Sequence, residues 1–467
     1  IELRDVIRTS GFVNLRPGGV VANGSLTAAD GVPIYIAEPA FAGETALGPF
    51  GFVLDAADLA NIQDGSAGIV IGGSTHVGQI LVSLDFPWLD NLTLQNGGAG
   101  SAGISIGAAI GNPGNLVTLS SGGRVAQAAP IAAASLLLHG TQPESSFQLD
   151  LPGNSVGTLA ARFELPKSLA DPSFGDVNFV NAGALAIGPL AGTGFDSAGD
   201  LPFAIVAANS TSGGDFFARN LAGNLTLNHG IATLGSDITL VTAGILDNAG
   251  GGTLAPAAGG VWRVWADTWV GETRGGLDPG NAQPNFYGCT YPGACASEVT
   301  IPAAGNHFIY RQRPTATVVA LDAARPFGLP NPPLGFTVTG LVNGDSAADA
   351  AAATLSTSAT VASPVGTYPI TGTSASAVGY VLDFVPATLS VLPNPVPQAS
   401  TVIEYAQSLL YGRNIGMQNM CLGTGPLLVS AAVDTPDRLD REWSRVRQLP
   451  NLTNCVEVGE RHGCKDF

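Results

Sequence analysis

Short apolar strands separated by turn residues recur along the first half of the chain, and they predict a repeating β structure. Segments such as NLTL at 91–94 and GISIG at 103–107 alternate apolar and polar positions, as strands with one buried face do. Five segments spaced 20 to 24 residues apart have anchors at Leu92, Leu116, Leu136, Val156 and Val177. Strands of three to five residues at such a period indicate a solenoid.

The residue types in these repeats favour a parallel β-helix over helical or leucine-rich solenoids. Thr, Val, Ile, Ser and Gly suit pleated, half-buried surfaces and tight corners, whereas leucine-rich repeats need a fixed Asn and a longer Leu ladder. We therefore expect an all-β chain in which residues 1–286 form the β-helix. Leu92 and Leu94 should face its core, and Thr93 should face outward.

A tryptophan-rich segment, GGVWRVWADTWVGETRGG at 259–276, follows the repeats. It contains Trp262, Trp265 and Trp269, three of the five tryptophans of the chain. Because the last layer of a solenoid exposes its core, these residues indicate a cap on the β-helix. The alternative is a platform on which carbohydrate rings stack.

The pattern changes after residue 309, where three further regions are expected. Strand-like runs at 315–321, 334–342, 354–361, 364–371, 380–384 and 388–392 predict a small Ig-like β-sandwich over 312–393. A connector at 287–311 precedes it, and a Pro-rich linker follows at 394–400. Residues 401–467 are expected to form a C-terminal attachment segment with short helices, one with an apolar stripe of Leu439, Trp443 and Val446.

Composition excludes several classes of protein. The chain has 467 residues, of which 12% are charged, and a net charge of −17. Nineteen cations against 36 anions cannot build the basic surface of a nucleic-acid-binding protein. No apolar run reaches the roughly 18 residues of a membrane-spanning helix, and 45% hydrophobic residues are too many for a disordered chain. Because the chain begins at Ile1 rather than Met, we expect it to be part of a longer protein.

The five cysteines predict two disulfides. Cys289 and Cys295 lie six residues apart in a loop rich in turn residues, and Cys455 and Cys464 lie nine residues apart near the end of the sequence. Short-range pairs of this kind indicate disulfides and an oxidising compartment. The alternative is five reduced, buried thiols. The remaining Cys421 is either a buried thiol or the site of an intermolecular bridge.

No pattern of catalytic or metal-binding residues emerges from the sequence. GNSVG at 153–157 matches GxSxG, and GAGSAG at 98–103 matches GxGxxG, but both lack the helix that those motifs require. The five histidines are scattered and no two are spaced i, i+4, so we expect surface or ladder residues rather than ligands. We therefore expect no catalytic residue, metal or cofactor. A β-helical polysaccharide lyase or hydrolase is the enzymatic alternative.

Two sets of strings resemble known families. NSVGTLA at 154–160, VNFVNAGALAIG at 177–188, AGNLTLNHG at 222–230 and SDITLVTAG at 236–244 resemble the coils of filamentous-haemagglutinin-like exoproteins of the two-partner secretion pathway. RPFGLPNPPLGFTVTGLVNGDSAA at 325–348, SPVGTYPITG at 363–372 and FVPATLSVL at 384–392 resemble the MBG bacterial Ig-like module. Together the resemblances cover residues 90–393 and imply a right-handed β-helix followed by an Ig-like domain.

The resemblance implies a non-catalytic adhesin or structural filament, either extracellular or at the bacterial outer-membrane surface. In some related adhesins a disulfide loop near the C-terminus plugs the outer-membrane transporter, and Cys455 and Cys464 resemble that loop. The alternative is a disulfide that staples a small terminal subdomain. The expected partners are a transporter or another surface protein, a host, matrix or neighbouring-cell ligand, and further copies of the chain, but no nucleic acid. A subunit of a larger surface assembly, attached through its C-terminal helix, is a further alternative.

Overall fold

The computed structural model describes residues 5–17, 20–22, 25–27, 30–38, 51–168, 170–234 and 236–394. The predictions made for the C-terminal segment lie outside the described residues, namely those for Cys421, Cys455, Cys464, Leu439, Trp443 and Val446. The described residues are almost entirely β, and their helices are the short α1 (Ala56–Ala60) and α2 (Ala347–Ala350). None of the helices among these residues is long and apolar enough to cross a membrane.

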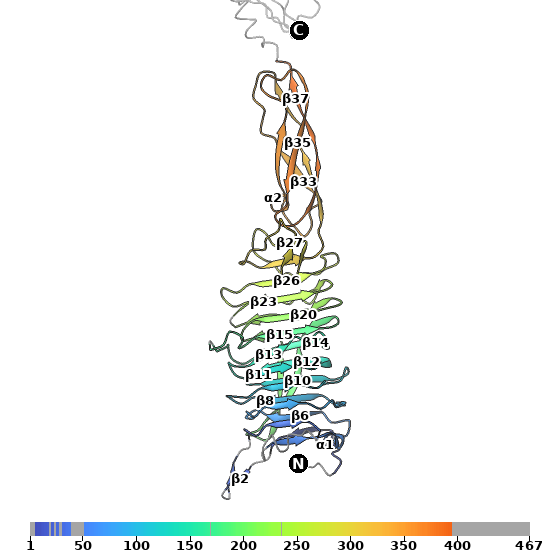
Figure 1. The fold of residues 1–467 in the computed structure, drawn as a ribbon, viewed down its shortest axis with the longest axis vertical. Helices are drawn as coiled ribbons and strands as arrows, with labels where there is room; N and C mark the ends of the chain where they lie inside the picture. The colour runs from blue at the N-terminus through green and yellow to red at the C-terminus, as the bar shows by residue number, and fades with distance from the viewer. Residues whose placement is uncertain are drawn as a thin grey trace, which may run out of the picture. The chain divides into compact units, whose positions relative to one another are not determined.

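The chain divides into two compact units. The first contains residues 1–321, 334–356 and 370–387, and the second contains residues 322–333, 357–369 and 388–467. Most of the first unit is a stack of layers, coloured blue to yellow in Figure 1. Successive layers contribute strands to two long parallel sheets.

Two long sheets run through the stack, and their strands pair in parallel. One has nine strands, in the order β1 (Phe12–Leu15), β6 (Gly68–Gly73), β8 (Leu92–Asn96), β10 (Leu116–Ser121), β12 (Ala132–Gly140), β14 (Ser155–Phe163), β16 (Leu185–Ile187), β21 (Leu225–Leu227) and β24 (Leu246–Asp247). The other has twelve, in the order β5 (Phe52–Leu54), β4 (Ile34–Ile36), β7 (Ile80–Val82), β9 (Ile104–Ile106), β11 (Arg124–Gln127), β13 (Ser146–Leu149), β15 (Val177–Asn181), β20 (Phe216–Asn220), β23 (Ile238–Thr242), β26 (Trp262–Ala266), β30 (His307–Tyr310) and β27 (Asn285–Tyr287).

Smaller sheets complete the first part of the chain. A third parallel sheet contains β19 (Ser210–Ser212), β22 (Ile231–Thr233) and β25 (Leu254–Ala255). Two short antiparallel pairs are β2 (Val20–Ala22) with β3 (Ser25–Thr27), and β28 (Cys289–Thr290) with β29 (Ala294–Cys295).

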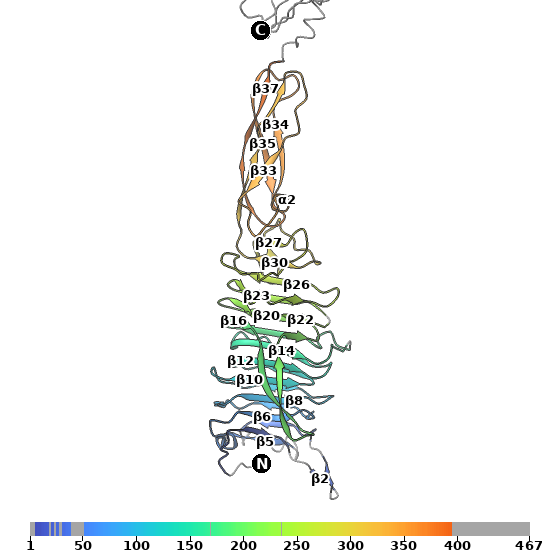
Figure 2. The ribbon, with the colours of Figure 1, turned by 180° about the vertical axis from the view of Figure 1, so that it is seen from behind.

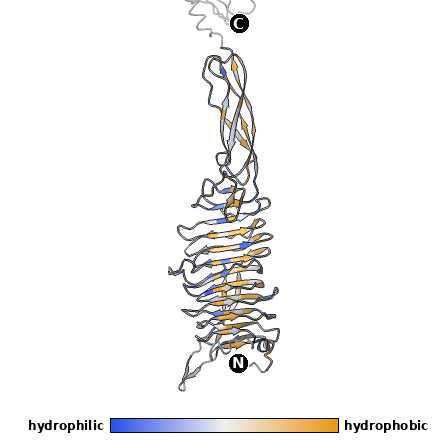
Figure 3. Cartoon of the chain, in the orientation of Figure 1, coloured by the Kyte–Doolittle hydropathy of each residue, from blue (hydrophilic) through white to orange (hydrophobic). Residues whose placement is uncertain are grey.

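The core of the stack lies between the long sheets. Leu92, Leu94, Ile104 and Ile106 are at most 2% exposed and belong to one continuous apolar cluster. Thr93 points to the other face, as the alternation predicts. Apolar residues recur on strand after strand in Figure 3, so burial of matching positions stabilises each layer against the next.

The repeating anchors were only partly equivalent. Leu92 aligns with Val117 rather than with the expected Leu116, and Val117 aligns with Leu136 and then Leu159. Val156 instead aligns with Ala133, and Val177 lies in the twelve-stranded sheet. The predicted register was therefore wrong at these positions, because a short apolar strand has the same pattern whichever sheet it joins.

An antiparallel hairpin crosses the layers on the outside. It consists of β17 (Leu190–Asp196) and β18 (Leu201–Ala207), which correspond to the green strands running across the stack in Figure 2. The Thr93 hydroxyl donates to the Thr193 carbonyl oxygen at 2.8 Å, and the Phe195 amide donates to Gln95 Oε1 at 2.7 Å. Arg16, just after β1, forms an ion pair with Asp200 at the hairpin turn. The hairpin thus fastens together layers that are far apart in sequence.

The stack continues beyond residue 286, the last residue expected in the β-helix. β26 pairs in parallel with β30, which also pairs with β27. The segment expected to be a connector therefore extends the twelve-stranded sheet to Tyr310, because its HFIY run is fully buried.

The remaining strands lie where the sequence predicts a β-sandwich. In the first unit β31 (Thr315–Ala320) pairs antiparallel with β33 (Phe336–Thr339) and parallel with β36 (Val381–Val385). In the second unit β32 (Ala323–Pro326) pairs in parallel with β37 (Ala387–Leu392). The other two strands are β34 (Ala352–Thr357) and β35 (Gly366–Ala375). Within the second unit, the buried Arg325 side chain donates to Asn331 and to the Thr360 carbonyl oxygen.

Candidate functional site

The three clustered tryptophans occupy different places at the end of the stack. Trp262 faces the core, with its ring 5.0 Å from that of Phe308. Trp269 packs edge-on against Tyr287 at 5.2 Å and Tyr310 at 5.8 Å. Trp265 lies on the opposite face of β26 from Trp262, because successive residues of a strand alternate. Trp262 and Trp269 therefore pack at the end of the core, whereas Trp265, although 7% exposed and part of the same cluster, also lines a cavity described below.

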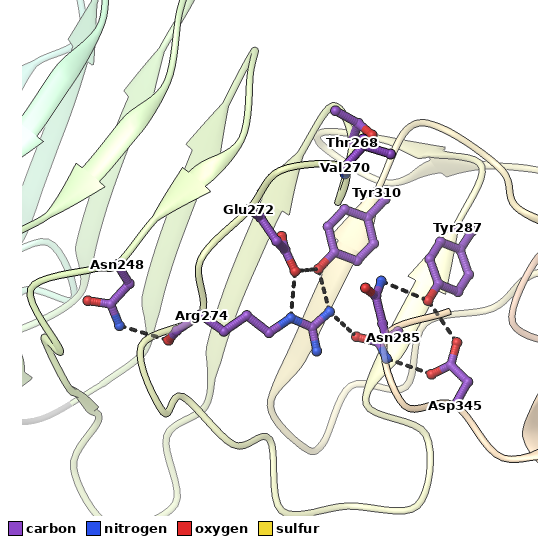
Figure 4. A network of polar contacts seen from close by, with 10 residues as sticks. Asn248, Thr268, Val270, Glu272, Arg274, Asn285, Tyr287, Tyr310 and Asp345 are labelled. Atoms are coloured by element: carbon purple, nitrogen blue, oxygen red, sulfur yellow. Dashed lines mark hydrogen bonds and ion pairs between the residues drawn. The ribbon is translucent and has the colours of Figure 1, made fainter. Parts of the chain in front are cut away.

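A buried polar network lies beside the aromatic rings (Figure 4). Arg274 Nε donates to Glu272 Oε1 at 2.5 Å, and Arg274 Nη2 donates to the Tyr310 hydroxyl at 2.6 Å and to Asn285 Oδ1 at 2.8 Å. The Tyr310 hydroxyl donates in turn to Glu272 Oε1 at 2.7 Å. The guanidinium also lies 4.0 Å from the centre of the Phe308 ring. Arg274 is thus held by charge, hydrogen bonds and an aromatic face together.

Asp345 continues this network from the turn after β33. Its carboxylate accepts hydrogen bonds from Asn285 Nδ2 at 2.5 Å and from the hydroxyls of Tyr287 and Tyr380 at 2.7 Å each. Asp345 is 7% exposed, and a buried carboxylate needs such donors to offset its lost hydration. The turn after β33 is therefore tied directly to β27 of the stack.

Burial keeps the network tyrosines protonated. It raises the pKa of Tyr287 and of Tyr380, and the nearby Asp345 carboxylate raises both further. Burial also raises the pKa of Tyr310, beside Glu272. The three hydroxyls consequently remain hydrogen-bond donors at neutral pH.

A glycine allows the backbones to meet at this junction. The Tyr287 amide donates to the Val378 carbonyl oxygen at 2.8 Å. A Cβ atom at Gly379 would lie 2.1 Å from the Tyr287 carbonyl oxygen, and Gly379 has φ of +103°. Only glycine fits both the left-handed backbone and the close approach. We call the contacts of Glu272, Arg274, Tyr287, Asp345 and Gly379 with their partners the polar junction.

The loop between β28 and β29 forms the rim of a cavity. Cys289 and Cys295, the pair expected from sequence, form a disulfide with their Cα atoms 4.0 Å apart. The loop carries Tyr291, whose ring lies 5.6 Å from those of Trp265 and Phe217. The adjoining cavity has a volume of about 230 Å³, and Arg219, Asp267 and Arg311 also line it.

A Ser–His–Glu line elsewhere in the stack bears on the enzymatic alternative. Ser120 Oγ lies 2.9 Å from His139 Nδ1, and His139 Nε2 lies 3.1 Å from Glu164 Oε1. Such a line is the arrangement of a nucleophile, base and orienting carboxylate. Ser120, however, is fully buried and His139 is 4% exposed, so a substrate cannot reach the hydroxyl. The line therefore fits a structural role across neighbouring strands.

The histidines expected at the surface or in ladders prove to be buried wherever the structure describes them. His76, His139, His229 and His307 are 2 to 7% exposed. Burial lowers the pKa of each, and that of His76 falls to about 4. In the described part of the chain, no three His, Cys, Asp or Glu side chains gather as a metal site would require.

The polar junction was not predicted from sequence, although its parts were visible. The Asn343–Gly344–Asp345 run has the composition typical of a turn, and Asn343 has a φ of +55°, which Asn tolerates well. Nothing in the local pattern shows that the carboxylate of this turn meets Asn285, Tyr287 and Tyr380, which lie 35 to 60 residues away.

Comparison with known families identifies one part of the chain. The model of the MBG domain (YGX type) matches residues 316–390, so the expected MBG module is confirmed. MBG domains are typical of bacterial surface proteins, and the chain is consistent with a surface or extracellular location. No curated protein and no solved structure matches the chain. The similarity to filamentous haemagglutinins therefore stays a prediction.

Proposed function

We propose that the protein works outside the bacterial cell as a non-catalytic filamentous adhesin or structural exoprotein of the two-partner secretion type. In this proposal the stack is a right-handed parallel β-helix, and the MBG domain is a spacer between the stack and an attachment segment. The observation that carries the proposal is the polar junction, which joins the last strands of the stack to the first part of an MBG domain.

The architecture supports a passive role in display. Inter-strand hydrogen bonds and a continuous apolar core connect successive layers, and the outer hairpin fastens several of them. A stack of this kind keeps its form without a bound ligand. The burial of Ser120 favours this role over the competing proposal of a polysaccharide-active enzyme.

The proposed partners follow from the two ends of the sequence. Residues 401–467 would attach the protein to an outer-membrane transporter or another surface protein, with Cys455 and Cys464 as the plug. The stack would meet a host, matrix or neighbouring-cell ligand, or further copies of the chain. Attachment as a subunit of a larger surface assembly is the variant of this proposal that an intermolecular bridge at Cys421 would support.

An attachment assay tests the proposal. A bacterial strain without the gene is compared with the same strain producing the full chain, for adhesion to host cells, to matrix-coated plates and to other bacteria. We expect the producing strain to adhere more strongly in at least one arm. Equal adhesion in all arms, together with cleavage of a polysaccharide by the purified chain, would favour the enzyme instead.

A further inference from the structure

The cavity beside the disulfide loop has the features of a small binding site. It opens on the outward face of the twelve-stranded sheet, with a volume of about 230 Å³. We propose that it binds a single sugar residue that carries a carboxylate, such as a uronic acid. The ligand would lie in this cavity, lined on one side by the strands of the sheet and on an adjoining side by the loop closed by Cys289 and Cys295.

The register of the strands builds the first wall. Arg219 of β20 pairs with Val241 of β23, which pairs with Trp265 of β26. Side chains of a strand alternate in direction, and Arg219, Val241 and Trp265 all line the cavity, so these three share the face of the sheet that borders it. An apolar and aromatic surface with a cation at one end therefore faces the cavity.

Tyr291 of the disulfide loop forms a second wall that adjoins the first, because its ring contacts those of Trp265 and Phe217 at 5.6 Å. Its ring stands nearly perpendicular to that of Trp265, at 82°, and both residues line the cavity. Aromatic walls of this kind pack against the C–H face of a sugar ring, and the polar rim meets its hydroxyls. The disulfide holds this wall in place, because it closes the loop that carries Tyr291.

Arg219 supplies the charge that selects the ligand. Its guanidinium lies 5.5 Å from the centre of the Tyr291 ring, and among the described residues it has no hydrogen-bond or ion-pair partner. Arg311, by contrast, is paired with Asp267. The N–H donors of Arg219 are therefore available to a ligand, and their planar fork matches a carboxylate.

Size and charge limit the ligand to one acidic ring. The cavity is smaller than the roughly 300–1,000 Å³ of sites for drug-sized ligands, and a single unpaired cation matches a single negative charge. The net charge of −17 also repels highly charged polyanions at long range. That the protein meets such sugars on surface glycans rests on the proposed function. That the cavity binds them rests only on its own residues.

Binding to the purified full chain tests the assignment. Saturation-transfer NMR and calorimetry would compare glucuronate with glucose, which lacks the carboxylate, and with glycolate, which lacks the ring. We expect glucuronate to bind at least tenfold more tightly than either. Equal binding of glycolate would overturn the sugar assignment, equal binding of glucose would overturn the role of the carboxylate, and absence of glucuronate binding would overturn the site.

Variants connect the binding to this cavity. Arg219→Gln should weaken glucuronate binding about tenfold to a hundredfold, the range for loss of a charge-assisted hydrogen bond, and leave the weak binding of glucose unchanged. Arg124→Gln is the matched control, because Arg124 is exposed on β11 of the same sheet and does not line the cavity. Equal affinity in wild-type protein and Arg219→Gln would place the binding elsewhere.

A second variant tests the disulfide wall without changing the charge. Cys289→Ser with Cys295→Ser should weaken binding while circular dichroism shows the same β content. Unchanged affinity would remove the loop from the site.

Failure of glucuronate to bind would leave the surface role intact, whereas bound glucuronate without adhesion by producing cells would count against the proposed function alone.

Discussion

Buried asparagines at the corners of the stack show how single side chains organise its turns. Asn181, 1% exposed, donates from Nδ2 to the carbonyl oxygens of Val156, Gly183 and Ala184, and its Oδ1 accepts from the Val156 amide at 2.8 Å. Asn220 aligns with it in the next layer and binds two more carbonyl oxygens. These amides satisfy backbone groups that a turn would otherwise bury without partners.

The buried histidines make stability depend on pH. His76 is 2% exposed, and burial lowers its pKa to about 4, against about 6.5 in an unfolded chain. Its contribution to the free energy of unfolding is present in full above pH 6.5 and is lost as the pH falls toward 4. Over this range the unfolded chain binds a proton at His76 that the folded chain does not, so acid favours unfolding. This difference between the folded and unfolded pKa values corresponds to about 3 kcal/mol in the free energy of unfolding.

Urea unfolding of wild-type protein and His76→Gln at pH 7 and pH 4.5 checks this prediction. We expect the wild-type free energy of unfolding to fall more steeply between the two values than that of the variant. The variant should keep a shallower fall, because burial also lowers the pKa of His139, His229 and His307. Parallel falls in both proteins would show that His76 titrates normally.

At the scale of elements, the crossing hairpin depends on close contact with the sheet beneath it. A Cβ at Gly192 would lie 2.4 Å from Thr118 Oγ1 and 3.0 Å from Leu137 Cδ2. Gly192→Val should therefore lift β17, weaken the bonds to Thr93 and Gln95, and lower stability by about 1–3 kcal/mol, as overpacking does. Limited proteolysis should cut the hairpin turn faster than in wild-type protein.

A glycine in open space provides the control for this change. A Cβ at Gly183 would meet no atom within 4 Å, so Gly183→Ala should leave both stability and cleavage unchanged. If Gly192→Val were cleaved no faster than wild-type protein, the hairpin would not be held by its contact with the sheet.

At the scale of the whole molecule, the polar junction connects the stack with the adjoining strands of the MBG domain, and we expect it to couple their unfolding. Asp345→Ala leaves the donors of Asn285, Tyr287 and Tyr380 without their acceptor. Loss of several buried hydrogen bonds should lower the free energy of unfolding by about 3 kcal/mol or more. Hydrogen exchange should accelerate at 285–287 and 342–346.

Asp349→Ala is the comparison for this variant. Asp349 lies in α2, four residues from Asp345, and its hydrogen bonds with Ser346 are exposed. We expect its free energy of unfolding to fall much less than that of Asp345→Ala, and hydrogen exchange at 285–287 to stay unchanged. Similar losses in the two variants would show that the junction contributes nothing beyond local turn structure.

The sequence revealed the strands of the stack and of the MBG domain better than their long-range arrangement. NLTL and GISIG fall in strands with their leucines and isoleucines facing inward, because alternation is a local property. The hairpin was missed, since residues 190–207 show the same apolar and glycine pattern as the repeats. The polar junction and the cavity at Arg219 were also missed, because each depends on residues that only the folded chain brings together.

The central claim is that this folded chain is displayed outside the cell. The most direct measurement is antibody binding to an epitope tag inserted between Ala198 and Gly199, in the exposed turn of the hairpin, on intact and on permeabilised bacteria producing the full chain. Display predicts equal staining of both preparations, with tag staining lost when intact cells are treated with protease. Staining that appears only after permeabilisation would contradict it.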